Sequence, residues 1–170
     1  MVAEAHEHNW GGERLMSRWG LWHTCRLCEQ LHHGVVRCAL GWACWRTYVG
    51  RPETDWVRLY AMTELGNGLS GVGQYEDALS VREAELSTLK RLGATEDLML
   101  VTQSNFASAY NNLGRQQDAL RMSRDVYSGR LRFNGGEHEE TVVAAGNYAS
   151  SLFSLRRFDE ARALLRNMVP

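Results

Sequence analysis

Apolar side chains recur with helical spacing in three separate stretches of the chain. Each stretch places three of them at offsets of i, i+4 and i+7, which lie on one face of a helix. The three sets are Leu65, Leu69 and Val72, then Phe106, Tyr110 and Leu113, then Tyr148, Leu152 and Leu155. Small residues stand inside the same stretches, at Gly66, Ala107 and Ala149. The pattern predicts three amphipathic helices whose small residues allow a neighbouring helix to approach closely.

A short polar motif follows each of these helices and contains a marker alanine. The motif starts at Gly73, Gly114 and Arg156, and the marker alanines are Ala78, Ala119 and Ala161. The alanines are 41 and 42 residues apart, an interval typical of stacked helical repeats. The residue before each alanine is acidic. The helix dipole favours a negative charge in the first turn of a helix, so a second helix is expected to begin here. Each repeat is therefore predicted to be a helix A, a tight turn and a helix B.

These patterns predict an all-α fold, an α-solenoid of about three antiparallel helix pairs. The pairs are expected at residues 54–94, 95–136 and 137–170, the last one incomplete. All six tryptophans and all four cysteines stand at or before Trp56, so a small, irregular Cys/Trp-rich module is expected at residues 21–53. Thr54 or Asp55 is the expected N-cap of the first repeat helix. Residues 1–20 show no readable pattern and are predicted to be a disordered leader.

The repeats resemble the tetratricopeptide family, in its longer kinesin-light-chain-like variety, over residues 55–170. Residues 105–115 read Asn-Phe-Ala-Ser-Ala-Tyr-Asn-Asn-Leu-Gly-Arg, similar to the family's Asn-Leu-Ala-x-x-Tyr-x-x-x-Gly-Arg signature. Residues 136–141 are similar to its Gly-x-Glu-His-Pro-x-Thr connector, with Glu139 in place of the proline. The first repeat departs most from this signature. Glu64 stands where the other two repeats have Asn105 and Asn147, and several glycines lie within its helix A. Glycine disfavours helix, so this repeat is predicted to be the weakest helix former of the three.

Stacked helix pairs form a concave face lined by their A helices, and polar positions on those helices are candidate binding residues. The candidate set is Glu64, Asn67, Asn105, Ser108, Asn112, Asn147, Ser150 and Ser154. The family resemblance implies that Asn105 and Asn147 face the groove and hold the backbone of a bound peptide. An amide suits this task because it offers both donors and an acceptor. The alternative is that these asparagines brace the neighbouring helix.

The cysteines form the one cluster whose spacing suggests site chemistry, as Cys25-x2-Cys28-x9-Cys38-x5-Cys44. A Cys-x-x-Cys pair can place two thiolates on one tetrahedral zinc, and a second pair completes such a site. This order, with Asp-Trp at 55–56, resembles a decayed MYND-type zinc finger that lacks its later ligands. We expect at best one structural zinc, held by Cys25, Cys28, Cys38 and Cys44 or with a histidine replacing one of them. Buried thiols in a degenerate finger, or a disulfide or redox pair, are the alternatives.

Charge and hydropathy exclude several classes of partner. The formal net charge is -1 and the isoelectric point is about 6.6, which leaves no basic footprint for nucleic acid. No apolar run approaches the roughly 20 residues that span a bilayer, and the first residues do not resemble a secretory signal. We therefore expect a soluble, cytoplasmic protein without nucleic-acid or membrane partners.

The sequence contains no catalytic constellation. It has no Gly-x-Ser-x-Gly elbow, no Walker loop and no His-Glu-x-x-His pair. His138 lies among three glutamates, but within the connector that resembles the repeat family. The chain is therefore predicted not to be an enzyme.

The resulting hypothesis is a non-catalytic adaptor that binds a peptide or protein partner in the groove of its repeats. The alternative is a zinc-dependent regulatory module, in which the cysteine segment is the working part and the repeats support it. Terminal repeats normally carry a polar outer face, whereas Leu164, Leu165 and Met168 would leave an apolar edge. This edge predicts either a fragment of a longer array or self-association through the C-terminal end.

Overall fold

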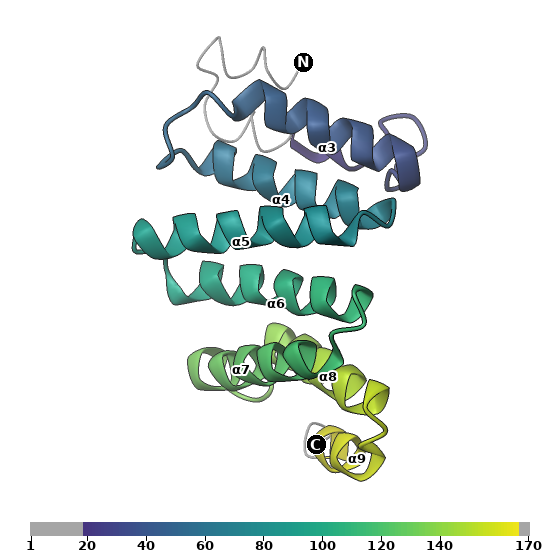
Figure 1. Cartoon of the computed structure of the whole chain (residues 1–170). Helices are drawn as coiled ribbons and strands as arrows, with labels where there is room; N and C mark the ends of the chain where they lie inside the picture. Colours follow the sequence, from purple (N-terminus) through teal and green to yellow (C-terminus); the bar gives the residue numbers. More distant parts are fainter. Residues whose placement is uncertain (1–18, 167–170) are drawn as a thin grey trace. The chain divides into compact units, whose positions relative to one another are not determined.

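The computed structural model describes residues 19–166, which belong to two compact units. The first unit ends at Val81 and the second begins at Arg82. The predicted leader lies almost wholly outside the described residues, as does Met168. The elements, in chain order, are η1 (Gly20–Trp22), α3 (Gly34–Tyr48), α4 (Trp56–Gly71), α5 (Tyr75–Arg91), α6 (Glu96–Asn112), α7 (Gln116–Asn134), α8 (Glu139–Ser154) and α9 (Phe158–Arg166) (Figure 1).

Every named element between residues 19 and 166 is helical, which confirms the predicted all-α class. The helices α4 and α5, α6 and α7, and α8 and α9 are the A and B helices of the three repeats. In the second unit, successive helices run antiparallel: the guanidinium of Arg130 on α7 is paired with Asp97 on α6, and the hydroxyls of Ser123 on α7 and Ser151 on α8 are 3.0 Å apart. The fold is thus built from adjacent helix pairs, as the repeat pattern predicted.

The turns between the A and B helices share one backbone geometry. Gly114 N–H donates to the Asn111 carbonyl (3.0 Å) and Arg115 N–H to the Tyr110 carbonyl (2.9 Å). The same pair of bonds follows α4 and α8, where the turn residues are Gly73 and Arg156. The residues Gly73, Gly114 and Arg156 are left-handed, with φ of 80°, 70° and 58°. This is the Schellman ending of a helix, which favours glycine at the left-handed position.

The small residues of the repeat pattern lie where helices touch. The marker alanines Ala78, Ala119 and Ala161 are all buried, as are Ala107 and Ala149 on the A helices. In the third repeat, Ala149 and Ala161 belong to one buried cluster with two leucines, Leu120 and Leu152. The close helix contacts predicted from the sequence are therefore present.

The first unit contains a helix that the sequence pattern did not predict. Residues 34–48 of the Cys/Trp-rich segment form α3, which packs antiparallel on α4. Two glycines allow the contact: a Cβ on Gly41 would lie 2.8 Å from the Glu64 carbonyl oxygen, and one on Gly68 would lie 2.9 Å from the Arg37 carbonyl oxygen. Gly68 of α4 therefore serves helix packing, whereas the sequence indicated only a weak helix former.

Aromatic side chains close the far end of the contact between α3 and α4. Trp19 and Tyr48 pack together with ring centroids 5.7 Å apart. The same buried cluster contains Cys44 of α3 and Val57 and Ala61 of α4. The predicted N-cap is confirmed at Asp55, whose carboxylate accepts from Val57 N–H at 2.9 Å. Within residues 19–166, no helix combines the length and the apolar character that crossing a bilayer requires.

Candidate binding groove

Two cavities lie end to end between the A helices α6 and α8 of the second unit. They have volumes of about 230 Å³ and 240 Å³, and both are lined by Ser104 and Asn147. The residues that line them on α6 stand about 42 positions before their counterparts on α8, so the two helices run parallel. The shared residues join the cavities into one groove, which we call the A-helix groove.

Most of the predicted binding residues of the second and third repeats line this groove. Asn105 lines the first cavity, Asn147 lines both, and Ser108, Asn112 and Ser150 line the second. Ser154 is exposed one turn beyond Ser150 and does not line either cavity; its hydroxyl donates to the Ser150 carbonyl at 3.1 Å. The positions chosen by helical spacing on α6 thus all line the groove, as do those on α8 except Ser154.

The two predicted residues of the first repeat lie in a different setting. Glu64 is only 8% exposed, and its carboxylate accepts from the Arg37 guanidinium of α3 at 2.9 Å. His23 Nδ1 lies 3.6 Å from the other carboxylate oxygen. Asn67 is half-buried on the same helix, and neither Glu64 nor Asn67 lines a cavity of the groove. The structure therefore does not place Glu64 on an open surface, because α3 covers it.

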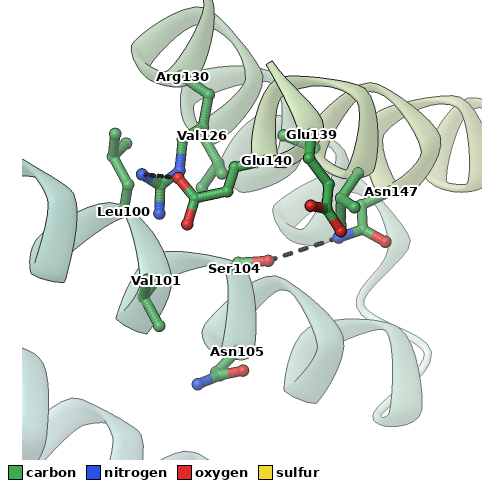
Figure 2. A pocket seen from close by; sticks show the side chains of 11 residues that line it. Leu100, Val101, Ser104, Asn105, Val126, Arg130, Glu139, Glu140 and Asn147 are labelled. Carbon is green, nitrogen blue, oxygen red and sulfur yellow. Dashed lines mark hydrogen bonds and ion pairs between the residues drawn. The ribbon is translucent and has the colours of Figure 1, made fainter. Parts of the chain in front are cut away.

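The two asparagines of the groove have different surroundings. Asn147 Nδ2 donates to Ser104 Oγ at 3.5 Å, a long bond that joins α8 to α6 (Figure 2). Asn105 makes no such contact with the described residues and keeps its amide available at the edge of the first cavity (Figure 2). A bond near 3.5 Å is weak and easily exchanged. Asn147 therefore has a bracing contact that a ligand amide could replace.

The apolar part of the groove was not singled out by the sequence analysis. Val101 and Val143 are 41% and 57% exposed and line the first cavity, whose floor is formed by Leu100, Val126 and Ala144. The two valines stand one helical turn before Asn105 and Asn147. The signal was present in the sequence, because the 42-residue interval that relates the asparagines also relates these valines.

Charged side chains gather at the end of the groove where α6 and α8 begin. The buried guanidinium of Arg130 is paired with Asp97 of α6 and lies 2.9 Å from Glu140 of α8. Asn134 Nδ2 also donates to Glu140 at 3.0 Å. The groove thus has an apolar and charged half, and a second half lined by neutral hydroxyl and amide groups.

The four cysteines do not gather into one site. Cys25 and Cys28 share a tight turn in which Cys25 N–H donates to the Gln30 carbonyl at 2.8 Å, and the backbone N–H groups of Cys28 and Leu27 lower the pKa of the Cys25 thiol. Cys44 is fully buried beside Tyr48, and this burial raises the pKa of its thiol. Within residues 19–166, no three histidine, cysteine or acidic side chains come close enough together to hold a metal ion.

Comparison with known proteins supports the repeat interpretation. Residues 99–140 match the family model described as Tetratricopeptide repeat. No curated protein matches the chain significantly in sequence. Among solved structures, a single-substitution variant of nearly identical TPR-like repeats from a candidate kinesin light chain of Podosopora anserina superposes with a TM-score of 0.67 at 19% identity. That alignment covers 77% of this chain and 63% of the other.

Two further structures have the same architecture. BtubC (BKLC) from P. vanneervenii has a TM-score of 0.65 at 18% identity, over 78% of this chain and 54% of its own. Another structure of the Podosopora anserina repeats has a TM-score of 0.65 at 15% identity, over 99% of this chain and 74% of that one. This chain therefore spans less than two thirds of the length of the first two, and the likeness concerns the fold.

Proposed function

Because the chain contains a tetratricopeptide repeat and shares the fold of kinesin-light-chain-like TPR repeats, we propose that it is a non-catalytic adaptor that binds another protein. The A-helix groove is the observation that carries the proposal. It combines an apolar cavity with amide and hydroxyl groups, the mixture found in sites that recognise a ligand by shape and by a few oriented polar contacts.

The ligand proposed for the groove is an extended peptide segment of the partner. An extended peptide presents unpaired backbone N–H and C=O groups. The side-chain amides of Asn105 and Asn147 can accept a hydrogen bond from a peptide N–H and donate one to a peptide C=O. One side chain of the peptide would enter the cavity between Val101 and Val143. Backbone contacts would supply affinity, and the cavity would supply selectivity.

The zinc-dependent regulatory module is the alternative proposal. It needs three or four ligands around one ion, whereas the described residues bring only Cys25 and Cys28 into one turn. Metal analysis of the purified full chain decides between the two. Stoichiometric zinc, together with loss of partner binding after chelation, would support the regulatory module against the adaptor.

The adaptor proposal is tested by capture of partners from a cell extract with the full chain. We expect wild type to capture a protein that the double variant Asn105→Ala/Asn147→Ala loses. The matched control is Gln103→Ala/Gln116→Ala, which removes two amides that line neither cavity. Circular dichroism must show equal helicity for all three proteins. Equal capture by all three would show that the partner binds outside the groove.

The C-terminal helix pair carries a second surface that we propose as a self-association site. Phe153 and Phe158 are 65% and 45% exposed, with ring centroids 5.0 Å apart. Together with Leu165 they line an apolar hollow of about 560 Å³. Contiguous exposed apolar surface of this kind marks interaction sites. The occupant proposed here is the same surface of a second copy.

A further inference from the structure

We propose that the A-helix groove prefers peptides whose anchoring apolar side chain is flanked by lysine or arginine, and that Glu139 sets this preference. The inference rests on the proposed peptide-binding function and adds the chemistry of the ligand. It follows from the size of the first cavity and from the way its charges are paired.

The first cavity fits a single apolar side chain and the residues next to it. Its volume of about 230 Å³ is below the range of about 300–1,000 Å³ typical of pockets for whole small molecules. Its apolar lining consists of the exposed Val101 and Val143 and the buried floor residues described above. The cavity therefore has room for one apolar anchoring side chain, such as leucine.

The one cation among the described residues that line the cavity is already engaged. Arg130 is 5% exposed at its side chain and is paired with both Asp97 and Glu140. A buried guanidinium with two carboxylate partners has no exposed donor face for an acidic ligand, and removing a partner from it is costly. Arg130 therefore holds the helices together and does not serve as a receptor for an acidic peptide.

The remaining charge in the cavity is the carboxylate of Glu139. Glu139 is exposed, lines the first cavity, and makes no hydrogen bond or ion pair with the described residues. Figure 2 shows its side chain extending from the start of α8 on the cavity side, separate from the Arg130–Glu140 pair. The positive end of the α8 dipole favours a carboxylate at this position. A basic side chain beside the anchor would give Glu139 the partner that the described part of the fold does not supply.

The second half of the groove carries no charge that would oppose or extend this preference. Its lining among the described residues consists of neutral groups, including Ser108, Asn112 and Ser150. The preference for a basic residue should therefore depend on the end of the groove at Glu139. One exposed ion pair contributes a modest energy, so the expected gain in affinity is about threefold to fivefold.

The test uses three fluorescein-labelled libraries of eight-residue peptides with a fixed central leucine. The leucine is flanked on both sides by arginine, by glutamine or by glutamate, and the other positions are degenerate. Anisotropy titration with the full chain should give the tightest binding for the arginine library. Glu139→Gln should abolish its advantage over the glutamine library. Glu137→Gln is the matched control, because it removes the same charge two residues away and outside the cavity.

The outcomes separate this inference from the proposed function. Tightest binding of the glutamate library, lost in Asn105→Ala/Asn147→Ala, would overturn the charge preference and leave the groove function standing. An arginine preference that survives Glu139→Gln would overturn the role of Glu139. If no library binds in a manner that depends on the asparagines, the inference and the peptide groove both fail.

Discussion

The third A–B turn uses an arginine where the first two use glycine. Arg156 has φ of 58°, and Gly73 and Gly114 have φ of 80° and 70°. A side chain with a Cβ in this left-handed conformation costs roughly 1–2 kcal/mol relative to ordinary backbone. The hydrogen bonds of the turn are nevertheless the same as in the other two repeats. The surrounding helices α8 and α9 therefore impose the conformation on Arg156.

Replacing this arginine should stabilise the protein. Arg156→Gly is expected to raise the free energy of unfolding by about 1 kcal/mol, because glycine adopts the left-handed conformation without the Cβ penalty. The measurement is urea unfolding followed by circular dichroism. Gly114→Ala is the matched reverse change and should lower stability by a similar amount. A loss of stability in Arg156→Gly would mean that the arginine side chain makes compensating contacts.

At the scale of the elements, the glycines of α3 and α4 stabilise helix packing, although helix propensity alone predicts that they weaken the helices. Glycine disfavours an isolated helix, yet Gly41 and Gly68 sit where the two backbones meet. The approach also brings Arg37 of α3 within hydrogen-bonding distance of Glu64. Burial of an acidic residue on α4 is tolerated because this guanidinium neutralises it. The Cys/Trp-rich segment thus contributes a packed helix to the first unit.

A methyl group at this helix contact should be poorly tolerated. Gly68→Ala is expected to lower stability by about 1–3 kcal/mol, because its Cβ would lie 2.9 Å from backbone atoms of α3. Gly146→Ala on α8 is the control, since a Cβ at that position would have open space for 4 Å around it. That change should instead stabilise the chain by about 0.5–1 kcal/mol. Thermal and urea unfolding of both variants would measure the difference, and equal effects would contradict the packing account.

At the scale of the whole molecule, the second unit presents two exposed surfaces suited to partners, the A-helix groove and the apolar edge at Phe153 and Phe158. They differ in chemistry: the groove mixes polar and apolar groups, whereas the edge is mainly aromatic and aliphatic. Different surfaces can serve different contacts at once. The proposed groove binding and the proposed self-association are therefore expected to be independent, so that separate variants should remove each of them.

Self-association is expected to depend on the aromatic edge. Sedimentation velocity of wild type should show a sedimentation coefficient that rises with protein concentration, because a second copy covers Phe153 and Phe158. Phe153→Gln should keep the protein monomeric over the same range. Val142→Gln, another exposed apolar position on α8 outside this hollow, is the control and should behave as wild type. A wild type that stays monomeric would contradict the proposal.

Part of the candidate site could be predicted because it follows the repeat. Asn105 and Asn147 occupy one register position, and Ser108 and Ser150 another, so helical spacing alone placed them together on the groove side. Helical spacing also selected Glu64 as a binding residue, but α3 covers Glu64 in the first unit and Arg37 pairs with its carboxylate. Coverage by a neighbouring helix is a tertiary property that no helical wheel contains. The cavity lining at Val101 and Val143 was missed because only polar positions on the A helices were considered as candidate binding residues.

The sequence by itself determined the repeat helices, their pairing and their turns, because these depend on contacts between residues close along the chain. The small residues of the A helices and the glycines at the first two turns are local patterns, and the constant interval between the marker alanines shows that the same unit recurs along the chain. Only the tertiary structure decided which polar side chains stay open and which charges are already paired. Arg130, Glu140 and Asp97 come from three helices, and their pairing leaves Glu139 as the carboxylate that faces the groove without a partner among the described residues.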